Sequence, residues 1–242
     1  MSKNNIDFHI IGAGRGGTSL IAGLLDYHPE IEVGFERHAV SYLLGKRLYF
    51  KRKNAFLQRT NAYLAACKRD SRKHPDLLWG NKITTEQIHG LKSHNKRNPN
   101  NQIDIIDQFF NHVLAQTKII FILRDGRACI NSKVNRTGQS YQSATKWWQY
   151  SVNYYRFFQE RHQNNICVRF EDLLGEPENE LRKITDFLGI PYDPEMLAGT
   201  NNAKMRPEYQ KKKLDPSKTK AIELREPYLS AIENDLKYCG YL

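Results

Sequence analysis

Short, continuous apolar runs alternate with longer amphipathic segments along most of this 242-residue chain, and this alternation restricts the fold more than any other feature. Five runs have the length and composition of strands: "FHII" (8–11), "IEVG" (31–34), "LLWG" (77–80), "KIIFIL" (118–123) and "ICVRF" (166–170). Because strands without polar alternation are typically buried on both faces, these runs predict a parallel sheet covered by helices. We therefore expect an α/β fold in which residues 1–242 form a single domain, with a five-stranded parallel sheet flanked by helices.

The segments between these runs predict the helices. They fall at 19–27, 39–68, 101–116, 128–135, 143–162 and 178–188, with a further helical region at 217–237. By contrast, "KSHNKRNPNN" (92–101) contains no apolar residue, and we expect a loop there.

The chain is strongly basic, with 37 Lys and Arg residues against 26 Asp and Glu and a formal net charge of +11. The basic residues gather in four runs: "KRLYFKRK" (46–53), "KRDSRKH" (68–74), "KSHNKR" (92–97) and "KKK" (211–213). A single run of this kind is usually a solvated face. The total excess nevertheless predicts an anionic partner, such as a nucleic acid, a polyphosphorylated cofactor or an acidic substrate.

Four cysteines, Cys67, Cys129, Cys167 and Cys239, stand far apart and form no C-x-x-C pair. This spacing favours reduced thiols over a zinc site or a disulfide framework, so we expect a cytoplasmic protein. The first residues, "MSKNNID", are polar, and no apolar stretch has the length of a signal peptide or a membrane span. We therefore expect no membrane-spanning segment.

A glycine-rich stretch, "HIIGAGRGGTSL" (9–20), follows the first predicted strand. It has the spacing G-x-G-x-x-G of dinucleotide-binding turns, and it lacks the lysine of the ATP-binding G-x-x-x-x-G-K-[ST] loop. Under either interpretation, the free N–H groups and the dipole at the start of a helix favour an anion. The candidates for binding it are Gly14, Arg15, Gly16, Gly17, Thr18 and Ser19. Among them, Arg15 adds a positive charge and donors suited to phosphate or sulfate oxygens.

The same stretch, continued as "GAGRGGTSLIAGLLDYHPEI", resembles the 5′-phosphosulfate loop of sulfotransferases that use 3′-phosphoadenosine 5′-phosphosulfate (PAPS). It is similar to the branch that includes tyrosylprotein and many bacterial and carbohydrate sulfotransferases, in which a strand leads to G-x-P-R-S-G-T-T-L and a helix ending in H-P. The residues that match this pattern are Gly12, Arg15, Gly17, Thr18, Leu20, His28 and Pro29. Gly14, Gly16 and Ser19 replace its proline, first serine and second threonine, and the loop keeps hydroxyl groups.

Four more segments resemble the same family, in the same order along the chain. They are "GFERH" (34–38), similar to the G-E-E-T-R segment of tyrosylprotein sulfotransferases; "WGNKIT" (79–84), similar to W-G-x-K-T-P; "KIIFILRDGRACINSKV" (118–134), similar to the 3′-phosphate motif; and "VRFEDLLGEPENELRKITDFLGIPYDPE" (168–195), similar to a largely structural V-R-Y-E-D-L segment. The resemblance implies a P-loop-NTPase-like sulfotransferase fold. It also implies an enzyme that moves the sulfuryl group of PAPS to a hydroxyl acceptor.

The family pattern assigns roles to individual residues. Arg124 and Ser132 would hold the 3′-phosphate, while Lys82, just past the third predicted strand, would approach the bridging oxygen of the leaving group. An acceptor hydroxyl needs a general base, for which Glu36 is the first candidate and His38 the second. The catalytic candidates are therefore Arg15, Glu36, Lys82 and His38, and this scheme requires no metal.

Two other classes of protein fit part of the sequence. A nucleic-acid-binding module agrees with the net charge and with aromatics such as those of "TKWWQYSVNYYRFF" (145–158), although a buried helix face explains these more simply. A P-loop-type kinase would need Mg²⁺, with Asp125 as a candidate ligand, and a replacement for the missing lysine. We expect a hydroxyl-bearing acceptor, such as an acidic glycan or peptide, and no nucleic-acid partner. The role of the basic loop 203–213 and the oligomeric state stay open.

Overall fold

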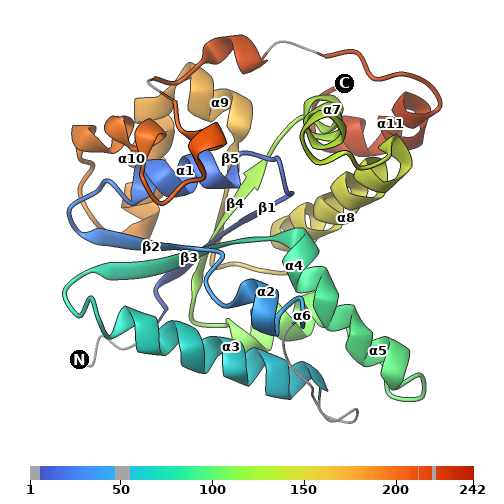
Figure 1. The fold of residues 1–242 in the computed structure, drawn as a ribbon, viewed down its shortest axis with the longest axis horizontal. Coiled ribbons are helices and arrows are strands. Elements are labelled where there is room, and N and C mark those ends of the chain that lie inside the picture. Colours follow the sequence, from blue (N-terminus) through green and yellow to red (C-terminus); the bar gives the residue numbers. More distant parts are fainter. Residues whose placement is uncertain (1–5, 47–54, 212, 220–221) are drawn as a thin grey trace.

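The computed structural model describes residues 6–46, 55–211, 213–219 and 222–242, in which five parallel strands form one sheet (Figure 1). The strands are β1 (Phe8–Gly12), β2 (Ile31–Phe35), β3 (Leu78–Thr84), β4 (Lys118–Leu123) and β5 (Asn165–Arg169), in the spatial order β2-β3-β1-β4-β5. Each strand pairs in parallel with its neighbours. The predicted α/β class, the five strands and the parallel sheet are confirmed.

Helices cover both faces of the sheet, and alternate residues of β1 point into two separate cores. Phe8 and Ile10 belong to the first core and Ile11 to the second, and all three are fully buried. The helices that contribute to the first core are α1 (Thr18–Leu25), α9 (Phe170–Gly175) and α10 (Pro177–Leu188). The second core contains residues of α3 (Ala55–Ser71), α7 (Gly126–Thr137), α8 (Tyr141–Glu160) and α11 (Tyr228–Tyr238). In Figure 1 the first group accordingly lies on the opposite side of the sheet from α3 and α8.

The predicted helix at 39–68 is wrong in its extent. The structure has α2 (Ala39–Tyr42) and then α3, and Gly45 between them takes a φ of 76°. This left-handed conformation ends a helix and favours glycine. Residues 47–54, which hold most of the first basic run, lie outside the described residues.

Three further segments differ from prediction. The expected loop at 92–101 contains α5 (Ser93–Arg97), which follows α4 (Thr85–His89) and the 3₁₀ turn η2 (Gly90–Lys92). The expected helix at 101–116 is reduced to α6 (Ile105–Asp107) and a π-helical turn, η3 (Gln108–Val113). The carboxyl-terminal region contains the 3₁₀ turns η4 (Pro194–Asn201), η5 (Pro207–Tyr209) and η6 (Pro216–Thr219) before α11. Residues 212, 220 and 221, which fall in the predicted basic loop and helical region, lie outside the described residues.

The strand order brings the carboxyl ends of β3, β1 and β4 side by side. After β1 the chain runs to β2 at one edge, returns through β3 and then crosses β1 to form β4. This reversal is a topological switch point, and open α/β sheets bind ligands in the crevice outside the strand ends at such a point. The glycine-rich turn after β1 and Arg124 after β4 both lie at this edge.

All four cysteines have free thiols, as their spacing predicts. Burial raises the pKa of Cys67 and of Cys167 to about 12, so both stay protonated at neutral pH. Within the described parts of the chain, no helix has the length and apolar character needed to span a membrane.

Candidate active site

The turn between β1 and α1 carries backbone N–H groups that are free to bind a ligand. Gly17 is the N-cap of α1 with a φ of 100°, and a Cβ there would lie 2.3 Å from the Phe170 ring, so only glycine fits. Within the described residues, the amides of Gly17, Thr18 and Ser19 donate to no protein group. Together with the dipole of α1, these amides suit an anion.

The other two glycines of the turn, Gly14 and Gly16, use their N–H groups for hydrogen bonds within the protein. Gly16 donates its N–H to the Ala13 carbonyl at 2.8 Å and does not line the cavity described below. Gly14 lines that cavity, but its N–H donates to both carboxylate oxygens of Glu86 at 3.0 Å. The amides of Gly14 and Gly16 are therefore engaged within the protein, and of the predicted amides those of Gly17, Thr18 and Ser19 stay free in the described part of the chain.

Glu86 belongs to a buried ion pair that the sequence analysis did not identify. Its carboxylate accepts hydrogen bonds from the Lys133 ammonium of α7 and, at 3.3 Å, from the Thr85 hydroxyl. The side chains of Lys133 and Glu86 are 5% and 19% exposed, so each charge depends on the other for its stabilisation. Because Glu86 also accepts the Gly14 N–H, the ion pair connects the glycine-rich turn to α4 and α7.

We expect Glu86→Gln to destabilise the fold, because a glutamine leaves the Lys133 charge buried without a counter-ion. The free energy of unfolding should fall by about 3 kcal/mol, as when one partner of a buried pair is removed. Urea unfolding followed by circular dichroism measures it. The control is Glu178→Gln, which breaks an exposed pair with Arg182 on α10 and should cost about 0.5 kcal/mol. Equal losses in the two variants would contradict the anchoring role of Glu86.

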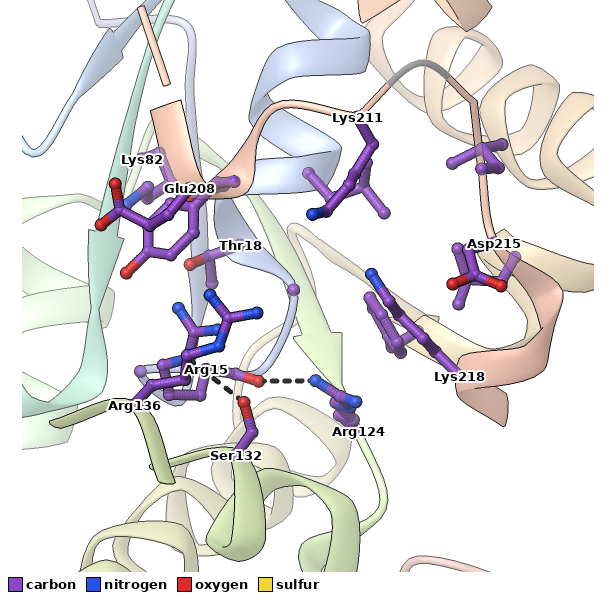
Figure 2. A pocket seen from close by; sticks show the side chains of 18 of the residues that line it. Arg15, Thr18, Lys82, Arg124, Ser132, Arg136, Glu208, Lys211, Asp215 and Lys218 are labelled. Carbon is purple, nitrogen blue, oxygen red and sulfur yellow. Dashed lines mark hydrogen bonds between the residues drawn. The ribbon is translucent and has the colours of Figure 1, made fainter. Parts of the chain in front are cut away.

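Arg15 of the turn, Arg124 after β4 and Ser132 of α7 converge at one place (Figure 2). Arg15 Nε donates to Ser132 Oγ at 3.3 Å, and Arg124 Nη1 donates to the Arg15 carbonyl at 3.0 Å. The Arg124 guanidinium also lies 4.3 Å from the centre of the Phe170 ring. Burial lowers the pKa of Arg124, yet a guanidinium stays charged at neutral pH. The structure thus brings together the three side chains predicted to bind phosphate groups.

Lys82 and Glu36 form an ion pair at the other side of the turn. Lys82 lies within β3, which continues to Thr84, and not past the strand end as predicted. Its ammonium is 2.5 Å from Glu36 Oε1, while Gln87 Nε2 donates to Glu36 Oε2 at 2.7 Å. Burial favours a higher pKa for Glu36, but the charge of Lys82 and the hydrogen bonds from Lys82 and Gln87 outweigh it, so this pKa lies below its usual value.

His38 does not reach this pair. Its Nε2 is 2.9 Å from Asp70 Oδ2, and Asp70 also bonds Lys73 at 2.8 Å. His38 is absent from the residues that line the cavity described next, so the structure separates the two predicted bases. Glu36 and His38 both have left-handed backbones, with φ of 58° and 64°, a conformation that costs about 1–3 kcal/mol in residues other than glycine.

A cavity of about 370 Å³ connects these groups. The predicted site residues that line it are Gly14, Arg15, Gly17, Thr18, Ser19, Glu36, Lys82, Arg124 and Ser132. The site is strongly basic, because two arginines and a lysine from the prediction face it together with free amides. A ligand that bridges its two sides would carry negative charge at both ends.

The sequence analysis missed several lining residues. They are Thr84, Arg136, Phe170, Leu174, Glu208, Tyr209, Lys211, Lys213, Leu214, Asp215 and Lys218, besides Leu20 of α1. Arg136 lies one helical turn after Ser132, a spacing that places both on one face of α7. Most of the others come from residues 207–211 and 213–218, which Figure 2 shows over the cavity. The Arg15 guanidinium lies 4.7 Å from the Tyr209 ring centre. The only sequence signal for this segment was its basic run.

Two alternatives lose support from the geometry. Asp125, the candidate metal ligand of a kinase, accepts from the side chain of Arg127 at 2.6 Å, caps α7 and does not line the cavity. The aromatics of α8 pack inward, with Tyr150, Tyr154 and Phe158 buried in the second core. These rings therefore serve the fold and are not arranged as a base-stacking surface.

The site thus combines a strand, a glycine-rich turn and a helix that present free amides with basic side chains around one cavity at a switch point. These are features of α/β proteins that bind phosphate groups. Residues 7–194 match the family model described as the sulfotransferase family, so the chain belongs to this family. The fold agrees. A sulfotransferase domain from the curacin biosynthetic pathway superposes with a TM-score of 0.66 at 17% identity, over 98% of both chains. A sulfotransferase domain from the Synechococcus PCC 7002 olefin synthase gives 0.69 at 18%, over 96% of this chain and 94% of that one.

Sequence relatives carry a more specific name. Protein-tyrosine sulfotransferase A of Caenorhabditis elegans is 28% identical over 204 residues, which cover 77% of this chain and 50% of that protein. Protein-tyrosine sulfotransferase 1 of Danio rerio is 26% identical over 203 residues, or 77% and 54% of the two chains. The chain thus spans about half the length of these relatives.

Proposed function

We propose that this chain transfers the sulfuryl group of PAPS to a hydroxyl acceptor. The observation that carries the proposal is the convergence, in one cavity at the switch point, of the free amides after β1, the Arg15–Arg124–Ser132 group and the Lys82–Glu36 pair. A doubly phosphorylated nucleotide with a sulfuryl group needs two anion sites and a cation beside the bond that breaks. The cavity offers candidates for both anion sites and for the cation.

The two anion sites differ in their donors. The amides of Gly17, Thr18 and Ser19 would bind the 5′-phosphate at the start of α1. Arg124 and Ser132 would bind the 3′-phosphate, for which a guanidinium and a hydroxyl are well suited. Lys211, Lys213 and Lys218, on the segment over the cavity, add positive charge for a ligand of this kind.

The transfer step would use the Lys82–Glu36 pair. The acceptor oxygen forms a bond to sulfur as the bond from sulfur to the bridging phosphate oxygen breaks, and adenosine 3′,5′-bisphosphate leaves. Glu36 takes the acceptor proton, and Lys82 and Arg15 stabilise the negative charge that builds on the leaving phosphate. In-line transfer of this kind depends chiefly on alignment and on charge stabilisation.

Binding of the donor would also activate Glu36. In the free protein, Lys82 lies 2.5 Å from the Glu36 carboxylate and lowers its pKa. When the Lys82 ammonium turns to the bridging oxygen, that stabilisation weakens and the effect of burial on the Glu36 pKa dominates. The carboxylate then becomes a stronger base only when a donor is present.

The acceptor proposed for the first assays is a tyrosine flanked by acidic residues. Two features support this choice: the basic lining of the cavity and the names of the two sequence relatives. The four free thiols support a reducing compartment, and we propose the cytoplasm as the location.

Calorimetric titration with adenosine 3′,5′-bisphosphate, beside ATP with Mg²⁺ and NADH, tests the proposal. We expect tight binding of the bisphosphate alone, and binding about 10- to 150-fold weaker for Arg124→Ala, because a hydrogen bond to a charged group contributes about 1.5–3 kcal/mol. Arg182→Ala removes an exposed arginine of α10 outside the cavity and serves as the control with unchanged affinity.

Preferential binding of ATP or NADH would refute the PAPS assignment and restore the kinase or dinucleotide interpretation. Unchanged bisphosphate affinity in Arg124→Ala would remove this residue from the 3′-phosphate site. A large fall in turnover at saturating PAPS, with little change in affinity, would instead place Arg124 in the chemical step.

A further inference from the structure

Two buried polar residues lie side by side on β1 and β3 next to the active site and have no part in the transfer step described above. His9 of β1 pairs in register with Asn81 of β3, which in turn pairs with Gly34 of β2. His9 and Asn81 are fully buried. A buried polar side chain destabilises the fold unless it makes hydrogen bonds. The hydrogen-bond partners of Asn81 therefore indicate its role.

The Asn81 side chain holds the backbone of Arg37 at two points. Arg37 N–H donates to Asn81 Oδ1 at 3.2 Å, and Asn81 Nδ2 donates to the Arg37 carbonyl at 2.9 Å. Arg37 stands between Glu36 and His38, the two residues with left-handed backbones. The pair of hydrogen bonds therefore stabilises an unfavourable turn that directly follows the candidate base.

Gly34 makes this contact geometrically feasible. A Cβ at that position would lie 2.9 Å from Asn81 Oδ1 and 2.8 Å from Arg37 Cγ. Both distances are too short for a side-chain carbon. Because Gly34 of β2 has no side chain, Asn81 can extend from β3 to the turn of residues 36–38.

The orientation of Asn81 is fixed from its other side. Nδ2 also donates to the Tyr63 hydroxyl of α3 at 2.9 Å, and that hydroxyl bonds His9 Nε2 at 2.8 Å. Tyr63 is fully buried. Because both amide hydrogens and the amide oxygen are engaged, Asn81 has one arrangement.

We propose that Asn81 is a positioning residue for Glu36, acting through the turn of residues 36–38. The assignment rests on the proposed role of Glu36 as the base. β2 ends at Phe35, and Glu36 makes the last backbone contact to β3, from its N–H to the Lys82 carbonyl at 2.8 Å. Beyond that contact, the two hydrogen bonds between the Asn81 side chain and the Arg37 backbone fix the conformation of residues 36–38. This conformation keeps the Glu36 carboxylate directed at Lys82 and the cavity.

A double-mutant cycle of Asn81→Ala and Glu36→Gln tests this assignment. The readouts are sulfuryl transfer from PAPS to a synthetic peptide with one tyrosine between glutamates, and release of sulfate to water. We expect Asn81→Ala to lower kcat about 30-fold, because misplacing a catalytic group by about 1 Å can cost about 100-fold. The KM for PAPS and the affinity for adenosine 3′,5′-bisphosphate should stay within about twofold of the parent, since Asn81 and Arg37 do not line the cavity.

The coupling is the decisive result. In the Glu36→Gln background, Asn81→Ala should change kcat by less than about twofold, because the group it positions is already gone. A repeated 30-fold loss in that background, or a raised KM with unchanged kcat, would overturn the assignment. Thr60→Val alters another fully buried polar residue of α3, whose hydroxyl bonds the Phe56 carbonyl and not Asn81, and serves as the control for damage to the core, with kcat within about threefold of the parent.

Gly34→Ala provides the same test with Asn81 in place. Its added methyl displaces Asn81 from the turn, so the same loss and the same coupling to Glu36→Gln are expected, and this variant replaces Asn81→Ala if the latter does not fold. If the parent is active and the losses in kcat from Gly34→Ala and Glu36→Gln are additive, the positioning role of Asn81 is overturned and the proposed function stands. A parent protein that transfers sulfate neither to the peptide nor to water would overturn the proposed function and this assignment with it.

Discussion

We expect Lys82→Ala to transfer sulfate about 10²- to 10³-fold more slowly than the parent, as when one preorganised donor to a developing charge is removed. Lys82 is only 4% exposed and lies beside the candidate base, so its charge acts at short range with little screening by solvent. A group that acts on the leaving oxygen during transfer contributes little to binding the product. The affinity for adenosine 3′,5′-bisphosphate should therefore stay near that of the parent.

The same variant has a second signature, in the pH dependence of kcat/KM, which reports the pKa of Glu36 in the free protein. Removing the Lys82 charge leaves burial as the main influence on Glu36, so its pKa rises. A base must be deprotonated, and the acidic limb of the profile should therefore move to higher pH. Lys183→Ala, which removes an exposed lysine of α10 outside the cavity, is the control. A kcat within about threefold of the parent would exclude the leaving-group role of Lys82, and a parallel loss of bisphosphate affinity would assign Lys82 to binding.

The strands could be predicted because each is buried on both faces and reads as an uninterrupted apolar run. "KIIFIL" is the clearest case, and β4 has the predicted bounds, Lys118–Leu123. Helix extents were less predictable, since they depend on single backbone conformations. α2 ends at Tyr42, and the left-handed φ of Gly45 is incompatible with the one continuous helix that periodicity predicts to residue 68.

The site was predictable where its residues lie at strand ends and in the turn, because the parallel topology alone brings such positions to one edge. Arg15 and Arg124 follow this rule and meet with a hydrogen bond at 3.0 Å. Glu86 and Asn81 do not, because their roles depend on which residues face each other across strands and helices. No local pattern indicates that a carboxylate of α4 would accept the Gly14 N–H.

The segment over the cavity was beyond prediction for a different reason. It has no helical or strand periodicity, and the basic residues of such a segment are as suited to solvent as to a ligand. Its position depends on tertiary contacts, such as the bond from Lys211 N–H to the Thr200 carbonyl at 2.8 Å and the packing of Tyr209 on Arg15.

The second large effect is expected from Glu36→Gln. Glutamine keeps the size of the side chain and an oxygen that accepts a hydrogen bond from Lys82, but it cannot take the acceptor proton. We expect kcat to fall about 10²- to 10⁴-fold, the usual contribution of a general base, with bisphosphate affinity unchanged. Glu32→Gln is the matched control, since Glu32 is a carboxylate of β2 that, like Glu36, pairs with a lysine, here Lys204, and it lies outside the cavity.

The pH profile and the second candidate base make this prediction specific. In the parent, kcat/KM should fall only at pH values below the usual carboxyl range, because this parameter reports the free protein, in which the pKa of Glu36 is lowered, and the carboxylate loses its basicity on protonation. That limb should vanish in Glu36→Gln. His38→Asn, which removes the imidazole bonded to Asp70, should leave kcat within about threefold of the parent, because His38 does not line the cavity. The reverse pattern, a large loss in His38→Asn with Glu36→Gln near normal, would make His38 the base and would require the turn of residues 36–38 to rearrange when the donor binds.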